Sequence, residues 1–186
     1  MNKVFLIVFI SFSTEVFSQY PLLLDSVMSK AFSPDGYSNT KIRFKNFYNN
    51  DLNNRVYTED SLKNKITFIN FWFEGCAPCV AEFDALNSLY DKYRSNQYFQ
   101  FISFTFESKE NALRIAEKYN LKYPILCLKK EIIYQLIFNL GFPTNIITDK
   151  IGEIRLIRCG GSPEKEKATL EIDSLFSKEI EYLINF

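Results

Sequence analysis

Residues 66–79 read ITFINFWFEGCAPC, and this stretch decides the fold. Its first eight residues are mostly β-branched or aromatic, which is typical of a buried strand. The short turn 74–75 follows, and then Cys76 and Cys79 stand three positions apart. After the first cysteine the apolar residues recur at steps of three and four, which predicts a helix. The stretch therefore predicts a strand, a turn, a Cys-x-x-Cys pair and a helix, in that order.

The predicted helix, residues 77–94, places the cysteine pair at its N-terminus. The first N–H groups of a helix have no partner within it, and partial positive charge gathers there. We therefore expect the pKa of Cys76 to lie below the ordinary thiol value of about 8.5. An exposed Cys76 thiolate would attack a disulfide, and the better covered Cys79 would resolve the mixed disulfide. Pro78 fits this interpretation, because a proline in the first turn loses no internal hydrogen bond.

A Cys-x-x-Cys pair can also be half of a zinc site, which needs two further ligands. The chain has no histidine, and Cys127 and Cys159 do not form a second close pair, so we expect no metal. Two unrelated buried thiols are a further alternative, and the strand before and helix after the pair disfavour it. Cys127 and Cys159 are either packed as small apolar groups or joined in a structural disulfide.

The composition is that of a single domain with a substantial core. The chain has 186 residues, of which 47% are hydrophobic, enough to bury most of the surface of one domain. Its 22 basic and 22 acidic residues give a formal net charge of zero. This balance gives no reason to expect a nucleic-acid partner or a polybasic contact with a membrane.

The N-terminus has the pattern of a secretory signal peptide. Lys3 precedes an apolar stretch at 4–12, and cleavage after Ser18 would fit, so we predict a signal peptide over residues 1–18. An uncleaved anchor is the alternative. Export would place the cysteines in an oxidising compartment. Residues 19–40 are predicted to be a lead-in segment without a sustained period, and residues 41–186 the folded domain.

The remaining elements alternate between strands and helices. The sequence predicts a β-hairpin with strands at 42–47 and 55–57, strands at 98–106 and 123–128, helices at 109–119 and 131–139, a second hairpin at 145–148 and 153–158, and a last helix to about 184. Ser162 is the expected N-cap of that helix, with Pro163 at its first position. This order predicts an α/β fold, a mixed central sheet flanked by helices, with an N-terminal β-hairpin and an inserted αβ unit.

Four sequence motifs in these elements resemble those of a known protein family. The motifs are NFW at 70–72, CAPC at 76–79 followed by Glu82, GFPT at 141–144 and DKIG at 149–152. Over about residues 41–186 the chain resembles the TlpA/ResA-like thiol–disulfide oxidoreductases of the bacterial envelope, a branch of the thioredoxin superfamily. The resemblance implies a thioredoxin-like fold, a redox-active disulfide between Cys76 and Cys79, and no cofactor.

The resemblance also implies roles for residues outside the cysteine pair. Pro143 would be a cis-proline beside the pair, and the backbone of Phe142 would then pair with an incoming polypeptide. Trp72 would belong to the same substrate-binding region. Glu82, three residues past Cys79, would tune the pKa of that cysteine or relay its proton. The alternative for Glu82 is a first-turn glutamate that only complements the helix dipole.

The chain departs from the family at one position, because Gly75 stands where family members usually carry tryptophan before the first cysteine. Glu74 adds a negative charge close by, which would oppose the stabilisation of a Cys76 thiolate. The sequence leaves open which of the two effects on Cys76 is larger, the helix dipole or this charge.

The leading prediction is a thiol–disulfide oxidoreductase of the periplasm or cell envelope that acts as a reductant. Its partners would be exported proteins with cysteine pairs and a membrane-embedded electron donor. A peroxiredoxin-like peroxidase is one alternative, although that chemistry wants a threonine where this chain has Phe73. A copper-binding module would rely on a histidine, which the chain lacks. A binding module without catalysis is the remaining alternative.

Overall fold

The computed structural model describes residue 29 and residues 41–185. The predicted signal peptide, and all of the lead-in segment except residue 29, lie outside the described residues. Among the helices that are described, none combines the length and the apolar character needed to cross a membrane.

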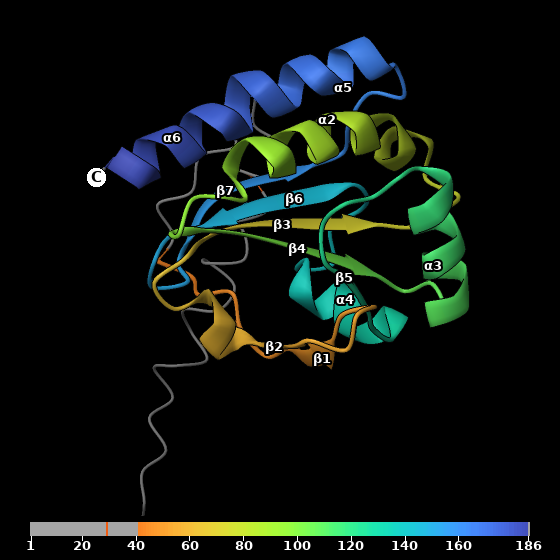
Figure 1. The fold of residues 1–186 in the computed structure, drawn as a ribbon, viewed down its shortest axis with the longest axis horizontal. Helices are drawn as coiled ribbons and strands as arrows, with labels where there is room; N and C mark the ends of the chain where they lie inside the picture. The colour runs from red at the N-terminus through yellow and green to blue at the C-terminus, as the bar shows by residue number, and fades with distance from the viewer. Residues whose placement is uncertain (1–28, 30–40, 186) are drawn as a thin grey trace, which may run out of the picture.

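A five-stranded mixed sheet forms the centre of the fold, in the order β5-β4-β3-β6-β7 (Figure 1). Its strands are β3 (Ile66–Trp72), β4 (Phe99–Thr105), β5 (Ile125–Cys127), β6 (Thr144–Thr148) and β7 (Ile154–Cys159). The strands β3, β4 and β5 run parallel, whereas β6 is antiparallel to both β3 and β7. Every residue of the central strand β3 is buried, which agrees with its almost continuous apolar sequence.

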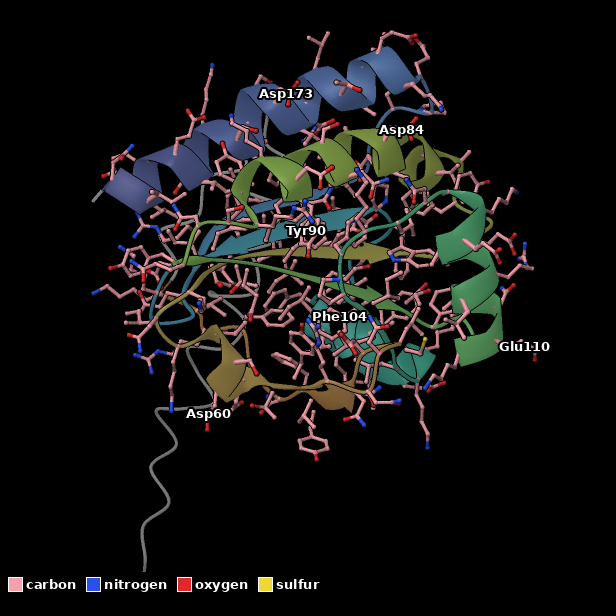
Figure 2. All side chains as sticks on the ribbon, viewed as in Figure 1. Asp60, Asp84, Tyr90, Phe104, Glu110 and Asp173 are labelled. Carbon is pink, nitrogen blue, oxygen red and sulfur yellow. A yellow bond between two sulfur atoms is a disulfide. The ribbon has the colours of Figure 1, made fainter. Side chains whose placement is uncertain are left out.

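Helices and a small hairpin cover the two faces of this sheet. One face is covered by α2 (Ala77–Tyr93) and by a C-terminal helical segment (Figure 1). This segment consists of α5 (Lys165–Glu171), a π-helical turn (Ile172–Ser177) and α6 (Lys178–Asn185). The other face is covered by α4 (Lys130–Leu136) and the hairpin of β1 (Tyr48–Asn50) and β2 (Val56–Thr58). The helix α3 (Lys109–Lys118) stands beside the edge strand β5. Figure 2 shows Tyr90 and Phe104 on opposite sides of the sheet. The fold is therefore the predicted thioredoxin-like α/β arrangement.

Alternation along the strands divides the core into two clusters. Phe68 and Trp72 of β3 face α2, whereas Ile69 and Phe71 face the opposite side, as the two-residue period of a strand requires. The same period places Asn70, between Phe68 and Trp72, on the side of the sheet that faces α2.

The N-terminal hairpin forms later in the chain than predicted. Its strands are β1 (Tyr48–Asn50) and β2 (Val56–Thr58), followed by a short 3-10 turn at Glu59–Leu62. Residues 42–47 instead run beside the start of β7, where Phe44 N–H donates to the Gly152 carbonyl over 2.9 Å. The second strand lies within a residue of its predicted place, but the predicted first strand was wrong, because the apolar residues of 42–47 mark the burial of Phe44 and Phe47 against the sheet and not a hairpin strand.

The last helix begins two residues after its expected first position, Pro163. Glu164 occupies the N-cap position of α5, and Ser162 Oγ accepts the Glu164 N–H over 3.1 Å in the turn before it. Ser162 therefore stabilises the approach to the helix but does not cap it. The helical segment also changes to a π-helical turn at Ile172–Ser177, which the residue pattern does not indicate.

Candidate active site

The cysteine pair lies where β3 passes into α2. Cys76 occupies the N-cap position of α2, and its Sγ accepts the Cys79 N–H over 3.2 Å. The two sulfur atoms are bonded to each other as a disulfide. Pro78 lies in the first turn of the helix, as its lack of an N–H allows. The pair is thus held at the end of the helix that stabilises negative charge.

Cys76 is less exposed in this disulfide form than expected. Its exposed fraction is 6%, against 1% for Cys79. The reason is that Cys76 is bonded to a cysteine inside the first turn of α2, and both belong to the buried cluster between α2 and the sheet. The order of accessibility still follows the prediction, with Cys76 the more accessible sulfur.

Glu82 lies inside the protein, in the second turn of α2. It is 2% exposed, and its Oε2 accepts a hydrogen bond from Asn145 Nδ2 of β6 over 3.0 Å. Asn145 Oδ1 in turn accepts from Asn70 Nδ2 of β3 over 2.8 Å. Burial raises the pKa of Glu82 to about 8, with the nearby Glu171 contributing in the same direction and the Asn145 hydrogen bond opposing it. Glu82 is therefore a carboxyl group that can hold or release a proton near neutral pH.

The Phe142–Pro143 segment lies beside this carboxyl group. The Phe142–Pro143 peptide bond is cis, as the resemblance implied. The Pro143 carbonyl accepts the Gly160 N–H over 2.8 Å, which joins the segment to the end of β7. Gly161 lies between Glu82 and Pro143, because a Cβ there would come within 3.0 Å of Glu82 Oε1 and 3.3 Å of Pro143 Cγ. Glu82 and Pro143 are thus neighbours across a glycine.

Phe142 is half-buried in a cluster of aromatic rings. Its ring meets those of Phe73, Phe106 and Tyr134 edge-on, with centroids 5.2, 5.7 and 5.8 Å away. Phe73 and Phe106 are themselves stacked, with centroids 5.2 Å apart. The cluster connects the segment before the cysteines with the segment before Pro143.

Trp72 does not lie at a surface. Its side chain is fully buried, the indole Nε1–H donates to Ser103 Oγ over 2.6 Å, and its ring meets Phe83 edge-on. The expected contact of Trp72 with a substrate is therefore wrong for this structure. The reason is its register in β3, which directs the side chain between the sheet and α2.

Cys127 and Cys159 are both free cysteines, so they form no structural disulfide. Cys159 is buried, and its Sγ accepts the Gly141 N–H over 3.2 Å. Burial raises the pKa of the half-buried Cys127 thiol. Among the residues that the structure describes, no group of three or more cysteine, aspartate or glutamate side chains is arranged to hold a metal ion.

The carboxylate of Glu74 turns away from the cysteine pair, towards α3. Arg114 Nη2 donates to Glu74 Oε1 over 2.6 Å, and this contact lowers the pKa of Glu74. Gly75, the residue before Cys76, is exposed. The sequence left open how strongly the charge of Glu74 opposes a Cys76 thiolate. The ion pair with Arg114 reduces this effect.

Sequence reasoning missed the partners of Glu82 and Glu74. Two asparagines inside otherwise apolar strands, Asn70 and Asn145, are a usable signal, because asparagine is depleted in strands and costly to bury without a partner. No comparable signal marks Gly161 or Arg114, which come to the site from distant parts of the chain.

The fold and the joined cysteine pair define a class of protein, the thioredoxin-fold thiol–disulfide oxidoreductases. Residues 41–157 match the AhpC/TSA family, and the chain belongs to this family. Within the thioredoxin superfamily it is a TlpA/ResA-like protein, as the resemblance of its motifs indicated.

Two curated relatives illustrate the similarity. The chain is 28% identical over 126 residues to thiol-disulfide oxidoreductase ResA of Geobacillus kaustophilus, covering 67% of this chain and 71% of that protein. It is 34% identical over 115 residues to thioredoxin-like protein YneN of Bacillus subtilis, covering 60% of this chain and 66% of that protein.

Two solved structures share the fold. A thiol:disulfide interchange protein of the thioredoxin family from Chlorobium tepidum aligns with a TM-score of 0.61 at 19% identity, over 77% of this chain and 97% of that chain. A secreted thiol-disulfide isomerase from Corynebacterium glutamicum aligns with a TM-score of 0.61 at 16% identity, over 83% and 96%.

Proposed function

We propose that this thiol–disulfide oxidoreductase acts as a reductant of exported proteins in the bacterial cell envelope. The observation that carries the proposal is the Cys76–Cys79 disulfide at the N-terminus of α2, with the carboxyl group of Glu82 buried behind it. The apolar N-terminal stretch of the sequence supports export, and a membrane-embedded donor would return electrons to the pair.

The reaction has two exchange steps. The thiolate of reduced Cys76 attacks one sulfur of a substrate disulfide, forms a mixed disulfide and releases the other substrate sulfur as a thiolate. The Cys79 thiolate then attacks Cys76 Sγ, which breaks the mixed disulfide and releases the second substrate thiolate. The substrate gains two electrons and the pair becomes the disulfide seen in the structure.

Glu82 and the Phe142–Pro143 segment have proposed roles in these steps. Glu82 lies three residues past Cys79 and would take the proton of that thiol as it becomes the attacking thiolate. With its pKa raised to about 8, Glu82 takes this proton only in its ionised form, which is the minor form at pH 7 and grows as the pH rises towards 8. The backbone before Pro143 would pair with an extended substrate segment, with Phe142 facing it.

The reduction potential of the Cys76/Cys79 couple tests the direction of electron flow. A potential near that of thioredoxin, about −270 mV, supports a reductant, whereas one near −120 mV contradicts it. We expect catalysis of insulin reduction that Cys76→Ser abolishes and the control Cys127→Ser leaves intact. Mass analysis of the protein recovered from a bacterial envelope should show a chain that begins at Gln19, and a full-length chain would favour the anchor.

A peroxidase is the competing function that the sequence left open. Phe73 occupies the position where peroxidase chemistry wants a hydroxyl group, and its ring, which carries none, packs against Phe106 and Phe142. Consumption of hydrogen peroxide faster by the protein than by Cys76→Ser would favour the peroxidase over the reductant.

A further inference from the structure

The turn that carries Cys76 is held by three side chains, one just before α3 and two in its first two turns. These are Glu107, Asn111 and Arg114, and we call them the α3 clamp. They lie about thirty to forty positions after Glu74, and all three contact Glu74. The clamp therefore joins the segment before the cysteines to a neighbouring element of the fold.

One peptide unit connects Glu107 to Cys76. The N–H of Glu74 donates to Glu107 Oε1 over 2.9 Å. The carbonyl group of that same peptide unit belongs to Phe73, and it accepts the Cys76 N–H over 3.2 Å. Because a peptide unit is planar and rigid, the carboxylate that fixes its N–H also fixes its carbonyl. Glu107 thus orients the acceptor of the Cys76 backbone.

A second set of contacts neutralises the charge of Glu74. Arg114 Nη2 lies 2.6 Å from Glu74 Oε1, and Asn111 Nδ2 lies 3.4 Å from Glu74 Oε2. Asn111 also joins the two halves of the clamp, because its Nδ2 donates to Glu107 Oε2 over 2.5 Å and its Oδ1 accepts from Arg114 Nε over 3.0 Å. Two further charges act on this ion pair: Lys118 lowers the pKa of Glu74, and Glu107 raises the pKa of Arg114.

We propose that Glu107, Asn111 and Arg114 are positioning residues for Cys76, which fix its turn and keep the Glu74 carboxylate paired away from the attacking sulfur. The proposal rests on the proposed role of Cys76 as the attacking thiol. The chain has a reason to need such a clamp, because Gly75 has no side chain that could anchor the turn and is exposed.

The charge-pairing half of the proposal is tested on the reduced protein with Arg114→Gln, Glu74→Gln and the double variant. Arg94→Gln is the matched control, because Arg94 is also a half-exposed arginine beside an aspartate, Asp91, but lies at the other end of α2. The readouts are the pH of half-maximal Cys76 alkylation, followed by peptide mass mapping, and the reduction potential of the pair.

We expect Arg114→Gln to shift the alkylation profile to higher pH and to slow alkylation at pH 7 by about two- to threefold, since an unpaired carboxylate disfavours a nearby thiolate. The potential should become more negative, because the reduced form is less stabilised. Glu74→Gln added to Arg114→Gln should restore both values. A profile for Arg114→Gln equal to that of Arg94→Gln, or a double variant without recovery, overturns the proposal.

Glu107 tests the positioning half. Glu107→Gln keeps an oxygen that can accept the Glu74 N–H, whereas Glu107→Ala removes it. We expect Glu107→Ala to slow the attack of Cys76 on a small aromatic disulfide, and Glu107→Gln to retain most of the rate. Equal rates for the wild type and Glu107→Ala overturn the positioning role. These readouts need no protein substrate, so they remain valid if insulin reduction fails and the proposed function falls.

Discussion

Replacement of Glu82 by glutamine should change how stability depends on pH. In the folded protein the pKa of Glu82 is raised to about 8 from an ordinary value of 4.5, because the carboxyl group is almost fully buried. Between these two values the folded chain holds a proton that the unfolded chain has lost. The free energy of unfolding of the wild type must therefore fall as pH rises through this range, and level off above about 8.

The structure sets the size of this effect. With pKa values of 4.5 unfolded and about 8 folded, the wild type should lose about 4 kcal/mol between pH 5 and pH 8.5 through this group alone. A glutamine does not titrate, and its carbonyl oxygen can still accept the hydrogen bond from Asn145 Nδ2. Glu82→Gln should therefore nearly match the wild type at pH 5 and exceed its stability by several kcal/mol at pH 8.5.

Urea unfolding of the disulfide form at pH 5, 7 and 8.5 measures this difference directly. Glu117→Gln, an exposed glutamate of α3, is the control and should run parallel to the wild type. If the stabilities of Glu82→Gln and the wild type stay parallel from pH 5 to pH 8.5, the carboxyl group is not protonated as the structure implies. The proposed proton exchange between Glu82 and Cys79 would then be contradicted.

Two further predictions concern the surroundings of the pair. Gly161→Ala should destabilise the protein by about 1–3 kcal/mol in urea unfolding and should slow insulin reduction. The reason is that the alanine Cβ would crowd Glu82 Oε1 at 3.0 Å and Pro143 Cγ at 3.3 Å. Unchanged stability and an unchanged rate would show that a side chain fits between Glu82 and Pro143. Titration of the denatured protein with a thiol reagent should find two free thiols before reduction and four after it, since Cys127 and Cys159 are free; the absence of free thiols before reduction would mean that these two cysteines are joined.

The placement of the cysteine pair could be predicted because its signals are local. A β-branched and aromatic run, a turn, and apolar residues at helical spacing all lie within residues 66–93. The boundaries of β3 and α2 agree with the prediction within a residue. Residues 42–47 show where this reasoning fails, because an alternating pattern reports which side chains are buried and not which backbone they pair with.

The roles of single side chains depend on contacts that residue spacing does not contain. Glu82 and Asn145 are 63 positions apart, yet their hydrogen bond and shared burial decide whether this carboxyl group carries a charge. Glu74 and Arg114 are 40 positions apart, and their pairing decides where the negative charge before Cys76 is directed. Trp72 is a large aromatic residue close to the cysteine pair, which suggested contact with a substrate. Only the register of β3 shows that its side chain is internal.

The sequence by itself determined the chemistry of this protein, because a disulfide between residues three apart at the start of a helix needs only local spacing and local backbone conformation. The tertiary structure alone decided the electrostatic surroundings of that disulfide. Burial and charge pairing depend on every element that packs against a group, and here those elements are β6, the end of β7 and the start of α3.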